Sequence, residues 1–258
     1  MSVRPKKELG QHFLVDENIL GVIDRLADLA AGDVVLEVGP GAGVLTVYLA
    51  ERVGFVHAVE VDRGLETVLR ERLATRSNVA LTFGDALALD LASLRPAPSK
   101  LVANLPYNIA TPLIVEGLDG LPNVAHWCVM VQREVADRLF APPATKAYGA
   151  VSVLVQLVTE RTGFHAVSRT VFRPQPRVDS ALVAFRRREL PPDFSAVKGV
   201  VEAAFAHRRK TLANSAELAG LVSRDRATRA LEAIGRSVRA RAEELSPQEF
   251  VSLTRALR

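Results

Sequence analysis

Five short apolar runs alternate with helical stretches between residues 33 and 140, and this alternation constrains the fold more than any other feature. The apolar runs are rich in valine, are bounded by glycine or polar residues, and read as buried strands (33–39, 55–61, 79–83, 100–103 and 126–132). Amphipathic stretches lie between them or directly after the last one (44–52, 63–73, 110–118 and 133–140). Strands and helices of these lengths form βαβ units, so we expect an α/β protein with a mostly parallel sheet and helices on both faces.

The segment before these strands is expected to form an N-terminal arm, and the segment after them is expected to form strands at the edge of the sheet. Residues 1–15 form an N-terminal arm, followed by a helix that Asp16 can cap and Gly32 can end. TGFHAVS and SALVAFRRR have the composition of two strands, and we expect them to be antiparallel strands at the edge of the sheet.

Beyond the proline pair at 191–192 the pattern is helical throughout. Helices are expected over 194–207, 209–218 and 224–234, and a last helix begins at a capping box in which Ser246 is the N-cap, Pro247 occupies N1 and Glu249 occupies N3. The predicted domains are therefore 1–188, including the arm, and a small all-α domain over 189–258.

The positive charge of the chain is concentrated in its tail. Residues 1–185 carry a net charge of −2, whereas residues 186–258 have 15 Lys and Arg against 9 Asp and Glu, a net of +6. A basic tail suggests contact with a polyanion, although an arginine-rich solvated helical surface explains the charge equally well.

Composition narrows the class of protein and its location. With 48% hydrophobic and 24% charged residues the chain is expected to be globular, and no apolar run approaches the roughly 18 residues that span a membrane. The basic N-terminus lacks an apolar segment of the kind found in secretory signals. Cys128 is the only cysteine and lies in a predicted strand, which indicates a buried thiol in a reducing cytoplasm.

Three alternating glycines follow the first strand and precede the first helix. Gly39, Gly41 and Gly43 allow a tight turn and close approach of a ligand to the free N–H groups of the helix start. Glu60 ends the second strand, 21 residues after Gly39, where a carboxylate can accept both hydroxyls of a ribose. This arrangement predicts a nucleotide-like cofactor.

The spacing of the glycines distinguishes two cofactors. A dinucleotide loop has the pattern G-x-G-x-x-G, and Val44 occupies the position of its last glycine, so NAD is disfavoured. The pattern E-x-G-x-G-x-G, from Glu37 to Gly43, resembles the S-adenosylmethionine (SAM) loop of class I methyltransferases. Asp85 follows the third strand at the same edge of the sheet and could accept a hydrogen bond from the cofactor's adenine amine, although an isolated Asp there is more often a helix cap.

The sequence NLPY follows the fourth strand, at the edge predicted to hold the cofactor. An exocyclic amine on a purine is a poor nucleophile, and it needs acceptors for its two hydrogens. The Asn104 side-chain oxygen and the Leu105 carbonyl could be those acceptors, while Pro106 fixes the turn. Tyr107 offers a stacking face, worth roughly 1–3 kcal/mol per base. No metal is expected, since positioning and electrostatics can carry methyl transfer from a sulfonium.

At this point the chain resembles the ribosomal RNA adenine dimethyltransferases, the KsgA/RsmA family. NLPY is similar to the (N/D/S)-x-P-(Y/F/W) motif of amino-methyltransferases, and further blocks resemble the family in order along nearly the whole chain (GQHFLVD, NLPYNIATPLI, QREVADRL, KAYGAVSVLVQ, FRPQPRVDSALV, FAHRRKTLANS and RAEELSPQEF). The resemblance implies a class I SAM-dependent, Rossmann-like methyltransferase fold with a small helical C-terminal domain that binds RNA or the ribosome.

The resemblance also implies roles for individual residues. Gln11, His12 and Leu14 would close over the methionine end of the cofactor, and further residues would bind SAM (Gly39, Gly41, Glu60, Asp85, Ala86 and Asn104). The target adenine would be held by Asn104, Leu105, Pro106 and Tyr107, with Phe172 stacking on its other face. The family often has Asn where this chain has His12, which leaves the contact of that side chain open.

Two groups of cationic residues are expected to contact RNA. Arg173 and Arg177 lie in VFRPQPRVD (171–179), the loop with two prolines, where they would face the RNA backbone. Arg208, Arg209 and Lys210 form a compact cluster at a predicted helix start. A solvated surface would explain this cluster too.

The function implied is SAM-dependent dimethylation of two adjacent adenosines near the 3′ end of small-subunit (16S) ribosomal RNA, with S-adenosylhomocysteine as product. The expected partner is the immature 30S subunit, and the enzyme is expected to be a cytoplasmic monomer without contact to a membrane. Two alternatives remain: a large-subunit adenine methyltransferase of the antibiotic-resistance type, and a non-catalytic RNA-binding assembly factor.

Overall fold

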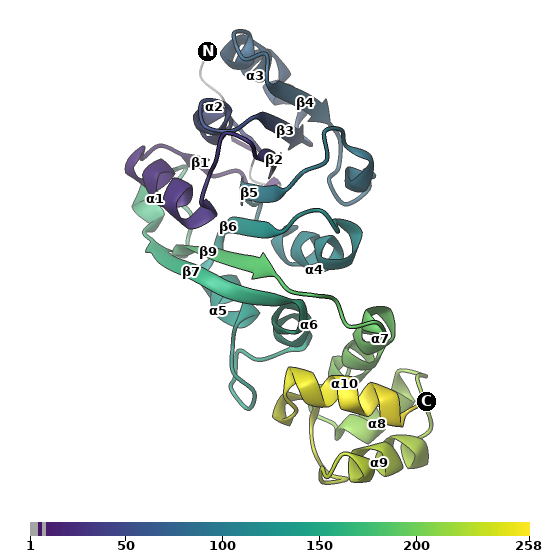
Figure 1. Ribbon diagram of the computed structural model, residues 1–258. Coiled ribbons are helices and arrows are strands. Elements are labelled where there is room, and N and C mark those ends of the chain that lie inside the picture. The colour runs from purple at the N-terminus through teal and green to yellow at the C-terminus, as the bar shows by residue number, and fades with distance from the viewer. Residues whose placement is uncertain (1–4, 7–8) are drawn as a thin grey trace. The chain divides into compact units, whose positions relative to one another are not determined.

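A mixed seven-stranded sheet forms the centre of the computed structural model, which describes residues 5–6 and 9–258. Its strand order is β4-β3-β2-β5-β6-β9-β7 (Figure 1). The five strands from β2 to β6 are parallel to one another: β2 (Val34–Val38), β3 (Phe55–Glu60), β4 (Val79–Phe83), β5 (Lys100–Asn104) and β6 (His126–Gln132). The predicted mostly parallel sheet is therefore confirmed.

The edge of the sheet has the predicted reversal of direction. β9 (Ser180–Arg187) is antiparallel to β6, and β7 (Thr159–Val167) lies beyond it at the end of the strand order. A separate two-stranded antiparallel sheet joins β1 (Phe13–Leu14) to β8 (Phe172–Arg173), which attaches the N-terminal arm to the loop with two prolines.

Helices cover both faces of the sheet, as the alternation of strands and helices predicts. They are α1 (Asn18–Ala27), α2 (Val44–Ala50), α3 (Glu66–Leu73), α4 (Ala110–Gly120) and α5 (Arg133–Leu139), with short 3-10 turns at Arg63–Leu65, Leu91–Ser93 and Arg169–Val171. In Figure 1, α1 and α4 lie on opposite sides of β6. Successive side chains of a strand point to opposite faces of the sheet. In β6, Trp127 lies against Gly117 of α4, while the sulfur of the next residue, Cys128, approaches the Ile23 carbonyl of α1.

Some helix boundaries differ from the predicted ones because of local capping. Asp16 accepts a hydrogen bond from the Asn18 backbone N–H, yet α1 begins only at Asn18. It ends at Ala27, well before Gly32, because Asp28 adopts a left-handed conformation with φ of 51°. The helix predicted from residue 209 begins at Leu212, since the Thr211 hydroxyl caps it by accepting from the Asn214 N–H.

The chain divides into two compact units, and the division corrects the predicted domains. The first unit contains residues 1–136 and 160–187, and the second contains 137–159 and 188–258. The predicted boundary after residue 188 lies next to the division after residue 187, but residues 137–159 fall in the second unit and interrupt the continuous domain predicted over 1–188. Helix α6 (Ala150–Val158) belongs to the second unit because it packs with α7 (Phe194–Phe205) and α10 (Pro247–Ala256).

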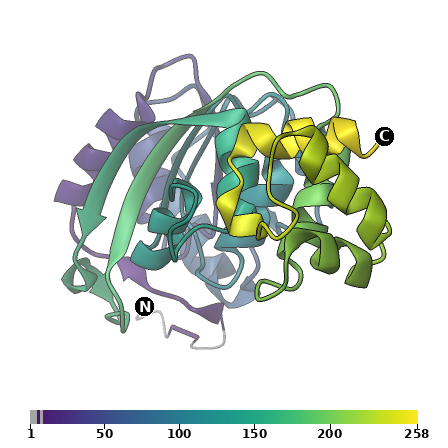
Figure 2. The same cartoon turned by 90° about the horizontal axis from the view of Figure 1, so that it is seen from below.

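The second unit is a helical cluster around aromatic side chains. Its remaining helices are α8 (Leu212–Leu218), α9 (Arg224–Ala233) and a 3-10 turn at Ala242–Glu244, and the tail helices gather together in Figure 2 (green to yellow). Phe205 contacts both Tyr148 and Phe250. The predicted capping box is present, with Ser246 accepting from the Glu249 N–H. Throughout the described residues, every helix is too short or too polar to cross a lipid bilayer.

Replacement of Gly117 by alanine should destabilise the first unit. A Cβ at this position would overlap the Trp127 ring, which is fully buried and stacked on Phe185. Because the ring has no free space to move into, we expect a loss of about 1–3 kcal/mol in the free energy of unfolding, measured by urea denaturation.

Gly120→Ala is the matched control in the same helix, since a Cβ there meets nothing within 4 Å. It should leave stability unchanged or raise it by up to about 1 kcal/mol through helix propensity. Equal stability of the two variants would contradict the proposed steric role of Gly117.

Candidate active site

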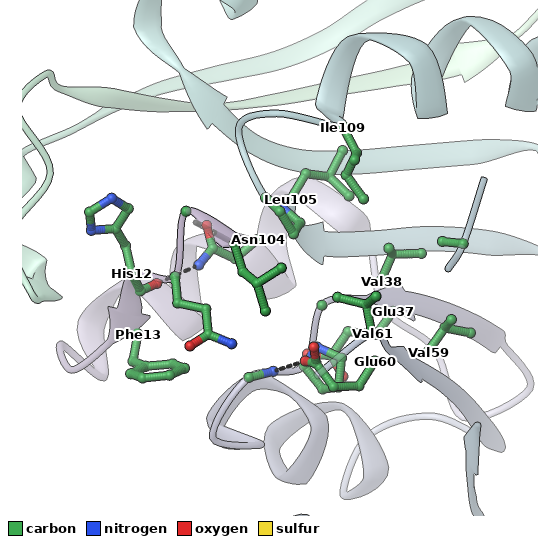
Figure 3. Close-up of a pocket in the computed structure, with 18 of the residues that line it drawn as sticks. His12, Phe13, Glu37, Val38, Val59, Glu60, Val61, Asn104, Leu105 and Ile109 are labelled. Carbon is green, nitrogen blue, oxygen red and sulfur yellow. Dashed lines mark hydrogen bonds between the residues drawn. The ribbon is translucent and has the colours of Figure 1, made fainter. Parts of the chain in front are cut away.

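A cavity of about 270 Å³ opens at the carboxyl edge of the sheet, within the first unit (Figure 3). Its walls come from the segments that follow β2, β3, β4 and β5 and from the N-terminal arm (residues 9–14, 37–42, 44–45, 59–61, 84–86 and 104–109). Parallel strands bring their carboxyl ends to one edge, which is why segments far apart in the sequence share this cavity.

The glycines after β2 permit a close approach of backbone to side chains. Gly39 and Gly41 have φ values of 75° and 59°. A Cβ at Gly39 would lie 3.0 Å from the Pro106 ring, and one at Gly41 would lie 2.9 Å from the Phe13 ring. Both positions therefore need glycine for conformation and for space.

Glu60 is a buried carboxylate with a fixed orientation. It is only 4% exposed, its Oε2 accepts from the Gly41 N–H at 3.0 Å, and its Oε1 accepts from the Asp62 N–H at 2.9 Å. Burial raises the pKa of Glu60, and these backbone hydrogen bonds act against the rise. The carboxylate is held at the cavity wall, where its remaining lone pairs can accept from a ligand.

Glu37 is the second buried acid of the cavity, and it was not singled out from the sequence as a site residue. It is 1% exposed, and its Oε2 has no hydrogen-bond partner among the described residues. Burial raises the pKa of Glu37 to about 8, and the charge of Glu60 adds to the rise. The sequence feature that could have identified Glu37 as a site residue is its position as the first residue of the E-x-G-x-G-x-G pattern.

The turn after β5 has the predicted geometry. The Leu105 N–H donates to the Met130 carbonyl at 3.0 Å, and the Pro106 carbonyl accepts from the Ile109 and Ala110 N–H groups, which starts α4. The Tyr107 hydroxyl lies 2.7 Å from the Ser180 hydroxyl. Burial raises the pKa of Tyr107, so the phenol stays protonated at neutral pH. Asn104 and Tyr107 thus face the cavity that Glu60 also lines.

The arm contacts this turn through its backbone. The Asn104 side-chain N–H donates to the His12 carbonyl at 3.1 Å, while the imidazole of His12 extends away from the cavity in Figure 3. The ring Nδ1 lies 2.7 Å from the Pro174 carbonyl, and the ring centroid lies 5.5 Å from that of Tyr107. The side-chain contact that the sequence left open is therefore with the Pro174 carbonyl, whereas Asn104 meets the backbone of position 12.

Gln11 and Leu14 line the cavity, and Gln11 is already hydrogen-bonded to protein; their contact with a cofactor stays a prediction. Its amide N–H donates to Asp62 at 2.9 Å, and its oxygen accepts from the Lys6 N–H at 2.8 Å. Asp62 was missed at the sequence level because its partners are more than 50 positions away.

Asp85 and Ala86 also line the cavity. Asp85 is exposed, and its Oδ1 accepts from the Leu87 N–H at 2.9 Å, which is the capping role considered from the sequence. Its contact with a cofactor stays a prediction. In the described part of the chain, no group of three or more His, Cys, Asp and Glu side chains could hold a metal ion.

The stacking role predicted for Phe172 is wrong in this structure. Phe172 has no exposed surface and belongs to the apolar core with Val171, Leu182 and Leu14, and it does not line the cavity. Pairing of β8 with β1 covers it, since Leu14 lies opposite Phe172. A buried ring offers no face to a base.

The cationic residues predicted to meet RNA do not line the cavity. Arg173 and Arg177 are exposed in the first unit, and Arg209 and Lys210 are exposed in the second. Arg208 donates to the Tyr148 carbonyl at 2.8 Å, so part of its guanidinium stabilises the second unit. RNA binding by these residues stays a prediction.

Comparison with protein families gives a match to the model described as "Ribosomal RNA adenine dimethylase" over residues 3–257. Two curated relatives are named "Ribosomal RNA small subunit methyltransferase A". The protein of Rubrobacter xylanophilus is 49% identical, with 98% of this chain and 95% of the relative covered, and that of Moorella thermoacetica is 43% identical, with 98% and 92% covered.

Two solved structures have similar folds. A dimethyladenosine transferase from Plasmodium falciparum has a TM-score of 0.77 at 25% identity, with 94% of this chain and 96% of that chain covered. The 23S rRNA methyltransferase ErmE has a TM-score of 0.68 at 28% identity, with 95% and 99% covered.

Glu37→Gln should change how stability depends on pH. Because the fold raises the pKa of Glu37 from 4.5 to about 8, the folded chain keeps a proton that the unfolded chain releases between these values. Wild-type stability should therefore fall as pH rises through this window. The variant should be more stable at pH 8.5, by on the order of 3 kcal/mol, with little difference near pH 4.5, in urea unfolding.

Glu71→Gln, at an exposed position of α3, serves as the control and should leave the pH profile unchanged. Parallel profiles for wild type and Glu37→Gln would show that the buried carboxyl is ionised at neutral pH.

Proposed function

Because the chain belongs to the ribosomal RNA adenine dimethylase family, it is a SAM-dependent adenine dimethyltransferase of small-subunit ribosomal RNA, and we propose that its targets are two adjacent adenosines near the 3′ end of that RNA. The observation that carries the proposed mechanism is the shared cavity of Asn104 and Glu60. In this cavity the Glu60 carboxylate can bind the ribose of a nucleoside cofactor, and the Asn104 amide can bind the amine of a base. This arrangement suits transfer of a methyl group from the cofactor to the base.

The residues present fit this cofactor. Glu60 is suited to accept from the ribose hydroxyls, and Gly39 and Gly41 leave the backbone accessible. The unpartnered Glu37 oxygen is suited to a cationic or N–H group of the ligand. When bound, SAM supplies an electrophilic methyl group and leaves as S-adenosylhomocysteine.

We propose that Asn104 and Leu105 activate the target amine. The N6 nitrogen of adenine shares its lone pair with the ring, and it becomes a nucleophile when its two hydrogens are directed at acceptors outside the ring plane. The Asn104 Oδ1 and the Leu105 carbonyl are these acceptors, and Tyr107, fixed by Ser180, carries the base. Attack of this nitrogen on the methyl group of a bound SAM would form a nitrogen–carbon bond as the carbon–sulfur bond breaks, and the N6 proton would pass to solvent. No strong base is needed, because the methylated amine is acidic until it loses this proton.

The ribosomal particle that serves as substrate and the cellular location of the enzyme are also part of the proposal. The substrate is an immature 30S subunit, held in part by the basic residues of the second unit, and the enzyme acts as a cytoplasmic monomer. The net charge of +6 over residues 186–258 supports contact with RNA phosphates.

Asn104→Ala should reduce methylation of small-subunit rRNA by at least about 100-fold, because the amine loses an acceptor used in the transition state. The measurement is incorporation of labelled methyl groups into undermethylated small subunits. Asn123→Ala, an exposed asparagine in the loop before β6, should act at the normal rate. A normal rate for Asn104→Ala would exclude the proposed mechanism.

A large-subunit adenine methyltransferase is the second candidate, because of the similarity to ErmE. Purified enzyme should methylate undermethylated small subunits and leave large-subunit rRNA unmodified, as read by mass spectrometry of the rRNA. Methyl groups found only on large-subunit rRNA would favour the second candidate. Absence of SAM binding in calorimetry, even with RNA present, would instead indicate an assembly factor without activity.

A further inference from the structure

An amide side chain can serve as acceptor at the amine only if its oxygen faces that amine. Asn104 carries an oxygen and an NH₂ group of nearly the same shape, and a half turn about the last side-chain bond exchanges them. In the exchanged orientation the Asn104 NH₂ group would face the substrate amine. Both groups are then donors, and the amine has no acceptor for its hydrogen. The reaction proposed for Asn104 therefore requires something that fixes the orientation of its amide.

The His12 carbonyl supplies this constraint. A carbonyl oxygen can only accept, so the group that it meets at 3.1 Å must be the Asn104 NH₂, and the oxygen is left for the other side. Position 12 is 92 residues away in sequence, and its side chain takes no part in the contact. The orientation of the amide thus depends on where the arm backbone lies.

Asp62 anchors the arm on the cofactor side of the cavity. Its two oxygens accept from the Lys6 ammonium at 2.7 Å and from the Gln11 amide at 2.9 Å. Burial alone would raise the pKa of Asp62, but hydrogen bonds from Lys6, Gln11 and Gly64 outweigh burial and lower it. The Asp62 side chain is therefore an ionised, buried anchor that does not itself line the cavity.

Two further contacts hold the arm on the substrate side. Phe13 and Leu14 pair with Arg173 and Phe172 in the two-stranded sheet, and the His12 imidazole meets the Pro174 carbonyl. The His12 carbonyl thus lies between an ionic anchor at Asp62 and a backbone anchor at β8. The Asp62 N–H also donates to Glu60, the carboxylate proposed for the ribose.

We propose that Asp62 is a positioning residue for methyl transfer: through Lys6 and Gln11 it holds the arm so that the His12 carbonyl orients the Asn104 amide. The arm thereby links the ribose end of the cofactor site to the orientation of the group that activates the amine. This inference rests on the role proposed above for Asn104.

The test compares Asp62→Ala and Lys6→Met, which remove the anchor from its two sides, with Lys6→Arg, which keeps the cation. Lys6 is about half exposed, so the Lys6 variants should fold even if Asp62→Ala does not. Arg63→Met removes a neighbouring exposed cation and serves as the matched control. The readouts are kcat with small subunits, the Kd of the cofactor by calorimetry, and hydrogen exchange of the Asn104 NH₂ group by ¹⁵N NMR.

We expect kcat to fall about 10-fold in Lys6→Met and further in Asp62→Ala, with the cofactor Kd within about threefold of wild type. Exchange of the Asn104 NH₂ should accelerate in both variants, and Lys6→Arg and Arg63→Met should resemble wild type. A loss confined to cofactor affinity, with kcat and the amide unchanged, would overturn the proposal and make the arm a cofactor clamp. Unchanged values throughout would also overturn it.

These outcomes are distinct from a failure of the proposed function. If Asn104→Ala methylates rRNA normally, the role of Asn104 is wrong whatever the amide exchange shows. If Asn104→Ala is inactive and the Asp62 and Lys6 variants retain full kcat, only the positioning role is wrong.

Discussion

The missing side chain at Gly39 is the constraint on which the site depends. A Cβ there would meet the Pro106 ring at 3.0 Å, and φ is +75°, so a side chain at this position would crowd the contact between the turn after β2 and the turn after β5. That contact joins the glycine turn, proposed to hold the cofactor, to the turn that carries Asn104. Methyl transfer requires donor and acceptor within van der Waals reach, and two neighbouring parallel strands supply this proximity without a dedicated linking segment.

The two buried acids of the cavity, Glu37 and Glu60, differ in the hydrogen-bond donors around them. Glu60 accepts two backbone hydrogen bonds, whereas Glu37 has an oxygen with no partner, and the pKa of Glu37 rises to about 8. Burial is common to both, and the difference lies in the donors that surround each carboxyl group. A cationic methyl donor entering this cavity would meet one carboxylate already oriented and one acid able to release a proton.

Local sequence predicted most of the fold and several of the segments that line the cavity. The glycine turn, Glu60 and the NLPY turn follow strands directly, so their positions come from strand order alone. Residues whose partners are distant could not be placed in this way. Phe172 reads as an exposed loop aromatic until the pairing of β8 with Leu14 is known, and Asp62 reads as a turn residue until Lys6 and Gln11 reach it. Helix α6 looked like part of the first domain because its apolar face does not reveal whether a sheet or other helices cover it.

The membership of α6 in the second unit has a consequence for how the protein is made. The chain leaves the first unit after residue 136, returns at 160 and leaves again after 187, so neither unit is a continuous piece. During synthesis α6 emerges before both of its packing partners, α7 and α10, so its apolar residues stay uncovered until those helices are translated. A chain that stops near residue 188 would leave that surface uncovered. The C-terminal helices therefore complete a unit that also contains α6, and a truncation near residue 188 would remove the packing partners of that helix.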